Sequence, residues 1–439
     1  SVFDDYQGWD LTPFLEVLEF YNDFNDYRVR VTVPKNFIVW GTGMLQNTNS
    51  VLQPAAAGRY SRSLSSDEVT TVATPADIRN GNITTQQDMN TWIFTANDIP
   101  DVAFGLSDHF RWDAGSVVVD NKTRRRASVQ AAYNDTSADY HYMVNYAKES
   151  LRWLSNKWPG IPYPYAKTTI FQGYAGMEYP MMANDETYED TTFSRFVAAH
   201  EIAHTYMPFY MGINETRYGF MDEGFATFYE YLLNKDNLGK EKADAFFRQF
   251  RVNGWASDNS IDQDQPIITP GPNLRGNGIG SNQYGKPALG YLAMKEMLGD
   301  DLFKKCLLAY MDRWHGKHPL PWDFFNSFNN VSGQNLNWFW NAWFFLPTWI
   351  DYSLEDVKKS GNQYFITIKN IGGMPAPLDL IISYADGTKE TLHKTPQAWK
   401  QNLQQHVINL PWKKMISGVQ ITSDIYMDAD TSNNTLPRK

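Results

Sequence analysis

Hydrophobic and polar positions alternate with a period of two in the first quarter of the chain. Residues 27–34 alternate strictly, and residues 37–40 and 91–95 are runs of β-branched and aromatic side chains separated by Gly, Pro and Asn. This pattern is typical of strands with one face on a core. It predicts an N-terminal antiparallel β domain over residues 1–118.

The pattern then changes to a helical period. Apolar side chains recur every three to five positions over residues 142–154, a short strand pattern covers residues 168–172, and residues 286–350 read as helices broken by Gly and Pro. Residues 119–350 are therefore predicted to form a mainly helical domain.

Alternation returns near the C-terminus. Residues 364–368 and 378–384 have the strand period, and Asp386-Gly387 is a hairpin signal. Residues 351–439 are predicted to form a small β-sandwich. The whole chain is thus expected to be a multidomain α+β protein.

Composition and charge limit the kinds of molecule that the protein is expected to bind. The chain has 439 residues, ample aromatic material for several cores, and a net charge of −10. Its one tight basic run, residues 122–126, is short, so no nucleic-acid partner is predicted. The most apolar stretches are far shorter than the roughly 20 residues of a membrane span, so none is predicted.

Two further features bear on the compartment. The single cysteine, Cys306, is predicted to be a buried small hydrophobe, so no disulfide forms within the chain. The chain begins at Ser1 without a signal-like apolar segment. The sequence does not determine the compartment, and a periplasmic or secreted location is slightly favoured over a cytoplasmic one.

The motif His200-Glu201-Ile202-Ala203-His204 carries the most chemistry. Two histidines four apart on a helix share one face, so both imidazoles can reach one cation. Eighteen residues separate His204 from Glu223, enough to end the first helix at Pro208 and to start a second near Met221. His200, His204 and Glu223 are predicted to hold one catalytic Zn²⁺ per chain, with Glu201 as the general base.

Three motifs in order resemble the aminopeptidase N family of zinc gluzincins. They are Gly173–Pro180, similar to the family's Gly-x-Met-Glu-Asn signature; the histidine motif with Glu223; and Tyr284-Gly285-Lys286, where the family has its catalytic tyrosine. The resemblance implies a thermolysin-like catalytic domain and a catalytic role for Tyr284. It also implies a substrate-binding segment that includes Gly176, Met177 and Glu178.

The chain departs from the family pattern in two ways. Ala175 and Tyr179 replace the first glycine and the asparagine of the signature, and bacterial members with Met-Glu-Tyr-Pro are closer to this chain. The N-terminal β domain is also shorter than in the family, and the second side chain that binds the substrate amine in its earlier half is missing here. Two explanations stay open: the chain is a fragment that lacks this part, or a partner segment supplies it.

The predicted function is a zinc aminopeptidase that acts on peptides with a free N-terminus. Glu178 is expected to grip the α-ammonium group while an edge strand pairs with the peptide, and Tyr284 to stabilise the oxyanion. The alternatives are a thermolysin-like endopeptidase, which needs no amine anchor, and a non-catalytic peptide-binding scaffold of the same fold.

Three other residues are left with two interpretations each. Glu230, seven residues after Glu223, is either an acceptor that orients a ligating histidine or a helix-surface charge. His315 and His318 are either a second metal pair or, as their spacing before Pro319 favours, part of a helix end.

Overall fold

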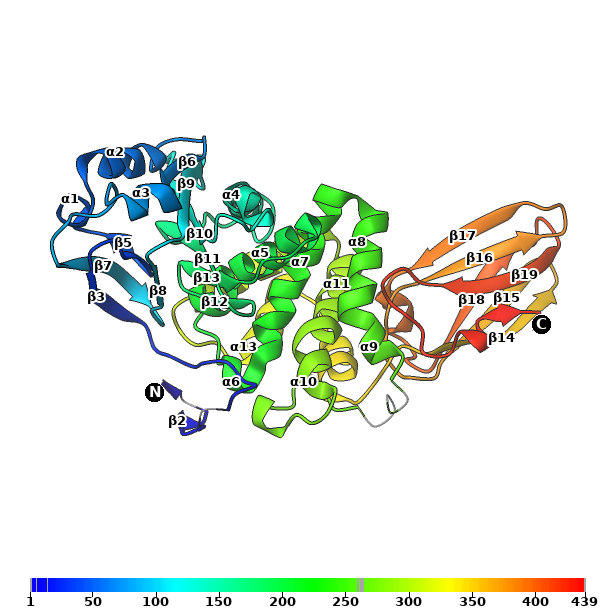
Figure 1. The fold of residues 1–439 in the computed structure, drawn as a ribbon. Coiled ribbons are helices and arrows are strands. Elements are labelled where there is room, and N and C mark those ends of the chain that lie inside the picture. Colours follow the sequence, from blue (N-terminus) through cyan, green and yellow to red (C-terminus); the bar gives the residue numbers. More distant parts are fainter. Residues whose placement is uncertain (1, 5, 14, 259, 261–263, 438–439) are drawn as a thin grey trace. The chain divides into compact units, whose positions relative to one another are not determined.

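The computed structural model describes residues 2–4, 6–13, 15–258, 260 and 264–437 (Figure 1). The chain divides into two compact units. Unit 1 comprises residues 1–14, 20–214 and 314–319, and unit 2 comprises residues 15–19, 215–313 and 320–439. No described helix is long and apolar enough to cross a membrane.

The first part of unit 1 is built from antiparallel strands, as the alternation predicts. The long strand β3 pairs with β7, which also pairs with β5, and β4 pairs with β8. Trp40 and Trp92 are fully buried in the core that these strands share with three short helices. The elements are β1 (Phe3–Asp4), β2 (Gly8–Trp9), β3 (Asn25–Pro34), β4 (Ile38–Gly41), β5 (Met44–Leu45), α1 (Thr48–Val51), α2 (Pro54–Ser63), α3 (Pro75–Arg79), β7 (Met89–Ile99) and β8 (Phe104–Ser107).

A six-stranded mixed sheet forms the second part of unit 1. Its strand order is β12-β13-β11-β10-β9-β6, with β11 parallel to both β10 and β13. The helix α4 packs against α5, and β12 is an edge strand. The elements are β6 (Thr70–Ala73), β9 (Arg111–Val118), β10 (Arg126–Tyr133), η1 (Asp139–Tyr142), α4 (Met143–Asn156), β11 (Lys167–Gln172), β12 (Met177–Tyr179), β13 (Met182–Asp185), α5 (Thr191–Ala203) and η2 (Thr205–Tyr210).

The hairpin of β9 and β10 spans residue 118, where the sequence predicts a domain boundary. The register pairs Val118 with Arg126, so the basic run lies in the turn and at the start of β10. The division into 1–118, 119–350 and 351–439 stays a prediction.

Unit 2 begins with helices around an aromatic core. Phe225 stacks on Tyr291 with ring centroids 4.1 Å apart, and Phe324 packs edge-on against both rings. The elements are α6 (Glu215–Tyr218), η3 (Gly219–Met221), α7 (Glu223–Leu238), α8 (Lys240–Phe247), η4 (Arg248–Val252), α9 (Asn253–Ala256), η6 (Gly271–Asn273), α10 (Gly278–Gly280), η7 (Ser281–Gly285), α11 (Lys286–Leu298), α12 (Asp300–Trp314), α13 (Pro321–Ser332), α14 (Asn337–Trp340) and η8 (Asn341–Phe345).

The C-terminal part of unit 2 consists of two antiparallel sheets, as the returning alternation predicts. Their strand orders are β14-β15-β18 and β17-β16-β19-β20. Asp386 and Gly387 form the turn between β16 and β17, where Gly387 has φ 84°. The elements are β14 (Tyr352–Ser360), β15 (Gln363–Asn370), β16 (Leu378–Tyr384), β17 (Lys389–Lys394), η9 (Pro396–Trp399), β18 (Gln405–Pro411), β19 (Ile416–Thr422), η10 (Thr431–Asn433) and β20 (Thr435–Leu436).

The predicted fold class is therefore confirmed. Antiparallel β sheets come first, a mainly helical region follows, and antiparallel β sheets end the chain. The buried Cys306 is also as predicted.

Candidate active site

The two motif histidines lie at the end of helix α5 in unit 1. The helix begins after Asp190, whose side chain accepts a hydrogen bond from the backbone N–H of Thr192. His200 is in its last turn and His204 follows its last residue, and their ring centroids lie 4.8 Å apart. Both side chains are buried. The spacing thus puts two imidazoles side by side, as predicted.

The backbone changes directly after the motif. The chain continues into η2, a segment of wider turns, in which Met207 has non-helical dihedral angles and Pro208 follows. The regular helix therefore ends at Ala203, five residues before the predicted end at Pro208. Wider helical turns of this kind are frequent at functional sites.

Glu201 lies beneath the segment that carries the predicted substrate-binding residues. A Cβ added to Gly176 would lie 2.8 Å from the Glu201 carboxylate oxygen Oε1. A side chain at position 176 would therefore displace the carboxylate of the predicted base. The next residue, Met177, is the first of β12 and pairs with Asn184 of β13.

Glu178 is the middle residue of the edge strand β12. Its side chain is buried, and its Oε1 lies 3.3 Å from Nδ1 of His204. A carboxylate beside Nδ1 favours the tautomer with the proton on that nitrogen, which leaves Nε2 to coordinate a metal. The sequence did not predict this contact with a predicted metal ligand.

The surroundings of Glu178 are strongly acidic. Burial, and then the charges of Asp139 and Glu178, raise the pKa of Asp185 to about 7. Among the described residues, neither carboxylate oxygen of Asp185 has a hydrogen-bond partner. Burial and the neighbouring carboxylates also raise the pKa of Tyr188 to about 12. Such a region favours a cationic ligand over an anionic one.

In unit 2, Glu223 is the first residue of α7 and is buried. Asp222 precedes it as the N-cap residue, and its carbonyl accepts hydrogen bonds from the N–H groups of Phe225 and Ala226. The following turns of α7 are buried in the aromatic core, which fixes the direction in which the helix starts.

Tyr284 lies in η7, next to the half-buried Arg251. The guanidinium carbon of Arg251 is 5.3 Å from the centroid of the Tyr284 ring. Lys286, the third residue of the motif, is fully buried and pairs with Asp264 at 2.9 Å, which anchors the start of α11. Burial outweighs this pairing and lowers the pKa of Lys286.

Glu230 is buried and does not form a surface charge, so that interpretation is wrong. Its carboxylate accepts hydrogen bonds from Nη2 and Nε of Arg251, the second over 3.3 Å. Burial opposes the charge of Arg251, but Glu230, Glu223 and Tyr284 raise the pKa of the guanidinium above its usual range. No sequence motif marks Arg251, because it is one of many basic residues on helical stretches.

His315 and His318 have structural contacts in unit 1. The ring of His315 stacks on Tyr210 with centroids 4.8 Å apart. His318 bridges the carbonyl of Gly212 at 2.8 Å and the carboxylate of Asp23 at 3.0 Å. These contacts agree with the helix-end interpretation that the sequence favoured.

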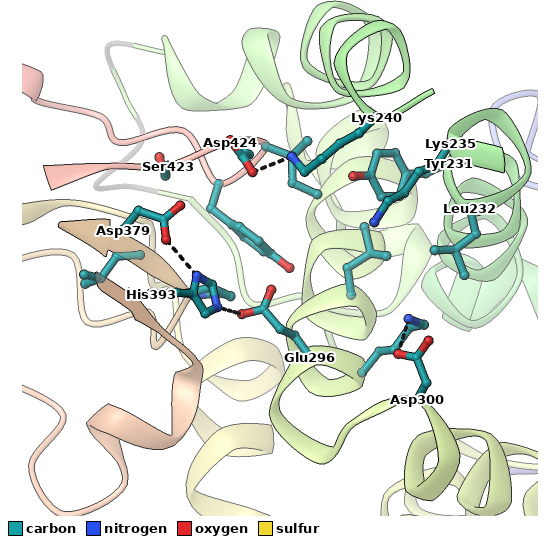
Figure 2. Close-up of a pocket in the computed structure, with 16 residues that line it drawn as sticks. Tyr231, Leu232, Lys235, Lys240, Glu296, Asp300, Asp379, His393, Ser423 and Asp424 are labelled. Atoms are coloured by element: carbon teal, nitrogen blue, oxygen red, sulfur yellow. Dashed lines mark hydrogen bonds and ion pairs between the residues drawn. The ribbon is translucent and has the colours of Figure 1, made fainter. Parts of the chain in front are cut away.

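A separate cavity of about 340 Å³ lies in unit 2 between the ends of α7 and α11 and the β-sandwich (Figure 2). Figure 2 shows His393 between Glu296 and Asp379, with its Nε2 2.7 Å from the first and its Nδ1 2.8 Å from the second. None of the described residues that line it is a predicted site residue.

His200 and His204 are buried in unit 1, and Glu223 is buried in unit 2. Two imidazoles and one carboxylate are the donors that zinc takes in catalytic sites. A helix that carries both histidines and an adjacent glutamate is the arrangement typical of zinc metallopeptidase sites.

Comparison with known proteins agrees with this class. Residues 142–343 match the Peptidase family M1 domain. This range includes all the predicted site residues, and the resemblance to the aminopeptidase N family is confirmed.

One similar solved structure is that of Legionella pneumophila aminopeptidase A in complex with aspartic acid. The TM-score is 0.62 at 12% sequence identity, and the match covers 93% of this chain and 43% of that chain. The likeness concerns the fold, and this chain spans less than half the length of that one. A comparison with curated protein sequences gave no match.

Proposed function

We propose that the protein is a zinc-dependent aminopeptidase that removes residues from the N-terminus of peptides. His200, His204 and Glu223 would hold the zinc, which supplies Lewis acidity and a water of lowered pKa when bound. The observation that carries the proposal is the pair of adjacent buried histidines, with Glu201 between them in the motif, within the residues that match the Peptidase family M1 domain.

The residues of the chain have separate tasks in this proposal. Glu201 accepts the proton of the attacking water and passes it toward the leaving amine. The phenol of Tyr284 donates a hydrogen bond to the oxygen on which negative charge develops. Lys286, held by Asp264, keeps the turn that carries Tyr284 in place.

Glu178 would make the enzyme an exopeptidase. Its carboxylate lies on a three-residue edge strand in an acidic region, and an edge strand offers backbone groups to an extended peptide. One carboxylate oxygen faces His204, and the other can accept from an α-ammonium group. A fixed amine sets the first peptide bond at the reacting position, so one residue leaves per cut.

The test uses aminoacyl fluorogenic substrates and matched N-acetylated peptides, with and without a chelator. We expect hydrolysis of the free-amine substrates only, loss of activity on chelation and recovery with zinc. Glu178→Gln should lower kcat/KM for free-amine substrates by at least ~10-fold, because a charge-assisted contact is lost. Glu189→Gln is the matched control, because Glu189 is an exposed glutamate of the same unit, just before helix α5.

Two results would contradict the proposal. Internal cleavage of acetylated peptides at the same rate would favour the thermolysin-like endopeptidase. Peptide binding without hydrolysis by the zinc-loaded protein would favour the non-catalytic scaffold.

A further inference from the structure

A buried ion pair in unit 2 has no task in the chemistry described so far. Glu230 lies two turns after Glu223 on α7, and its side chain is fully shielded from solvent. Both of its oxygens accept from the guanidinium of Arg251, whose side chain is 16% exposed. A two-pronged contact of this kind fixes the plane of the guanidinium as well as its position.

Such a pair contributes little net stability. Removing two charges from water costs several kcal/mol per ion, and the mutual attraction of the charges only offsets this cost. Apolar residues of similar volume would stabilise the helices at least as well. The pair does, however, impose one defined orientation on Arg251.

The oriented guanidinium faces Tyr284. Its carbon is 5.3 Å from the ring centroid, within the range of a cation–π contact. The backbones also touch, because a Cβ on Gly285 would lie 1.8 Å from the carbonyl oxygen of Arg251. Arg251 and Tyr284 then line the same open cavity of about 600 Å³, so the ring has an open side opposite its packed one.

We propose that Arg251, held by Glu230, is a positioning residue for Tyr284. The guanidinium holds the phenol ring against η7 and keeps it from turning into the open cavity. This inference rests on the proposed function in one respect, the catalytic use of Tyr284. In this proposal Glu230 orients Arg251, and Arg251 in turn positions Tyr284.

The kinetic test is a double-mutant cycle on the zinc-loaded enzyme. Arg251→Gln should lower kcat by ~10- to 100-fold with little change in KM, because a misplaced catalytic group loses rate and not binding. In the Tyr284→Phe background the same substitution should change kcat less than about twofold. Arg251→Lys should recover only part of the loss, since an ammonium group cannot form the two-pronged contact.

Arg248→Gln is the matched control. Arg248 belongs to the same element, η4, and donates to the backbone carbonyl of Asp424 instead. Its substitution should leave kcat unchanged. Equal losses from Arg251→Gln in the native and Tyr284→Phe backgrounds would overturn the proposal and leave the pair with a structural role only.

A second measurement does not depend on hydrolysis. In protein with ¹³C-labelled tyrosine rings, the Tyr284 signal is the one that Tyr284→Phe removes. Arg251→Lys and Glu230→Gln, the milder changes, should shift or broaden this signal, and Arg248→Gln should not. An unchanged signal in both variants would overturn the proposal. A shifted signal in an enzyme that lacks aminopeptidase activity would support the positioning and contradict only the proposed function.

Discussion

Replacing Asp185 by Asn should stabilise the protein, and the gain should grow with pH. Asp185 ends strand β13 and is 1% exposed, and in the part of the chain that the structure describes neither of its carboxylate oxygens has a hydrogen-bond partner. Burial, Asp139 and Glu178 raise its pKa from 3.8 to about 7. The folded protein therefore retains a proton that the unfolded chain releases.

The sign of the effect follows from this difference. Below about pH 4 both states are protonated, and Asp185 has no pH-dependent cost. Between about pH 4 and 7 only the unfolded chain ionises, so the native free energy of unfolding falls as pH rises. Above about pH 7 the free energy of unfolding has lost the full contribution caused by Asp185. About three pH units at ~1.36 kcal/mol each give about 4 kcal/mol as an upper bound.

The amide of Asn has a similar shape and does not ionise. Thermal unfolding should show a smaller difference in melting temperature between Asp185→Asn and the native protein at pH 4.5, where the cost is ~1 kcal/mol, than at pH 8. At pH 8 the variant should melt several degrees higher, since ~1 kcal/mol corresponds to ~2–4 °C in a unit of this size. Asp88→Asn, at an exposed turn of the same unit, controls for the lost charge. A difference that is constant from pH 4.5 to 8, or that reverses, would refute the reasoning.

Two further substitutions test the base and the tyrosine turn. Glu201→Gln should retain zinc and the fold but lose ~10²-fold or more in kcat, because the amide cannot accept a proton; near-normal turnover by the zinc-loaded variant would remove Glu201 from that role. Gly285→Ala should destabilise the protein by ~1–3 kcal/mol and lower kcat, because the new Cβ would lie 1.8 Å from the carbonyl oxygen of Arg251. Urea titration and steady-state kinetics measure the two effects, and an unchanged midpoint would show that η7 can move away.

Local patterns predicted the elements well. The alternation at residues 27–34 became β3, the strand pattern at 168–172 became β11, and Gly299 ends α11 with φ 78°. Each of these depends on neighbours in the sequence, such as side-chain alternation or the freedom of glycine at positive φ. The fold class could therefore be predicted.

The pairing of the strands could not be predicted from the sequence. The sheet joins β9 to β10 across residue 118, and β11 to β13 in parallel. Periodicity shows that a residue belongs to a strand but does not identify the strand beside it. The edge position of β12, on which the proposed peptide pairing depends, became visible only in the structure.

The site residues divide in the same way. The sequence identifies His200, Glu201 and His204, because all three belong to one motif of five consecutive residues. It does not identify Arg251, because its partner Glu230 lies 21 residues away and an isolated arginine has no motif. The spacing of Glu230 from Glu223 was visible in the sequence. Its role, however, depends on its burial and on its contact with Arg251, which only the structure shows.

Four of the predicted site residues stand at or beside the ends of helices. His200 and His204 occupy the end of α5, Glu223 the first position of α7, and Tyr284 the turn directly before α11. The helix bodies beyond these ends are buried in apolar cores, which hold the ends rigid. Polar side chains at such ends can reach a substrate without interrupting the core. This explains why a short motif identifies the chemistry, whereas distant buried contacts such as Glu230 with Arg251 set its precision.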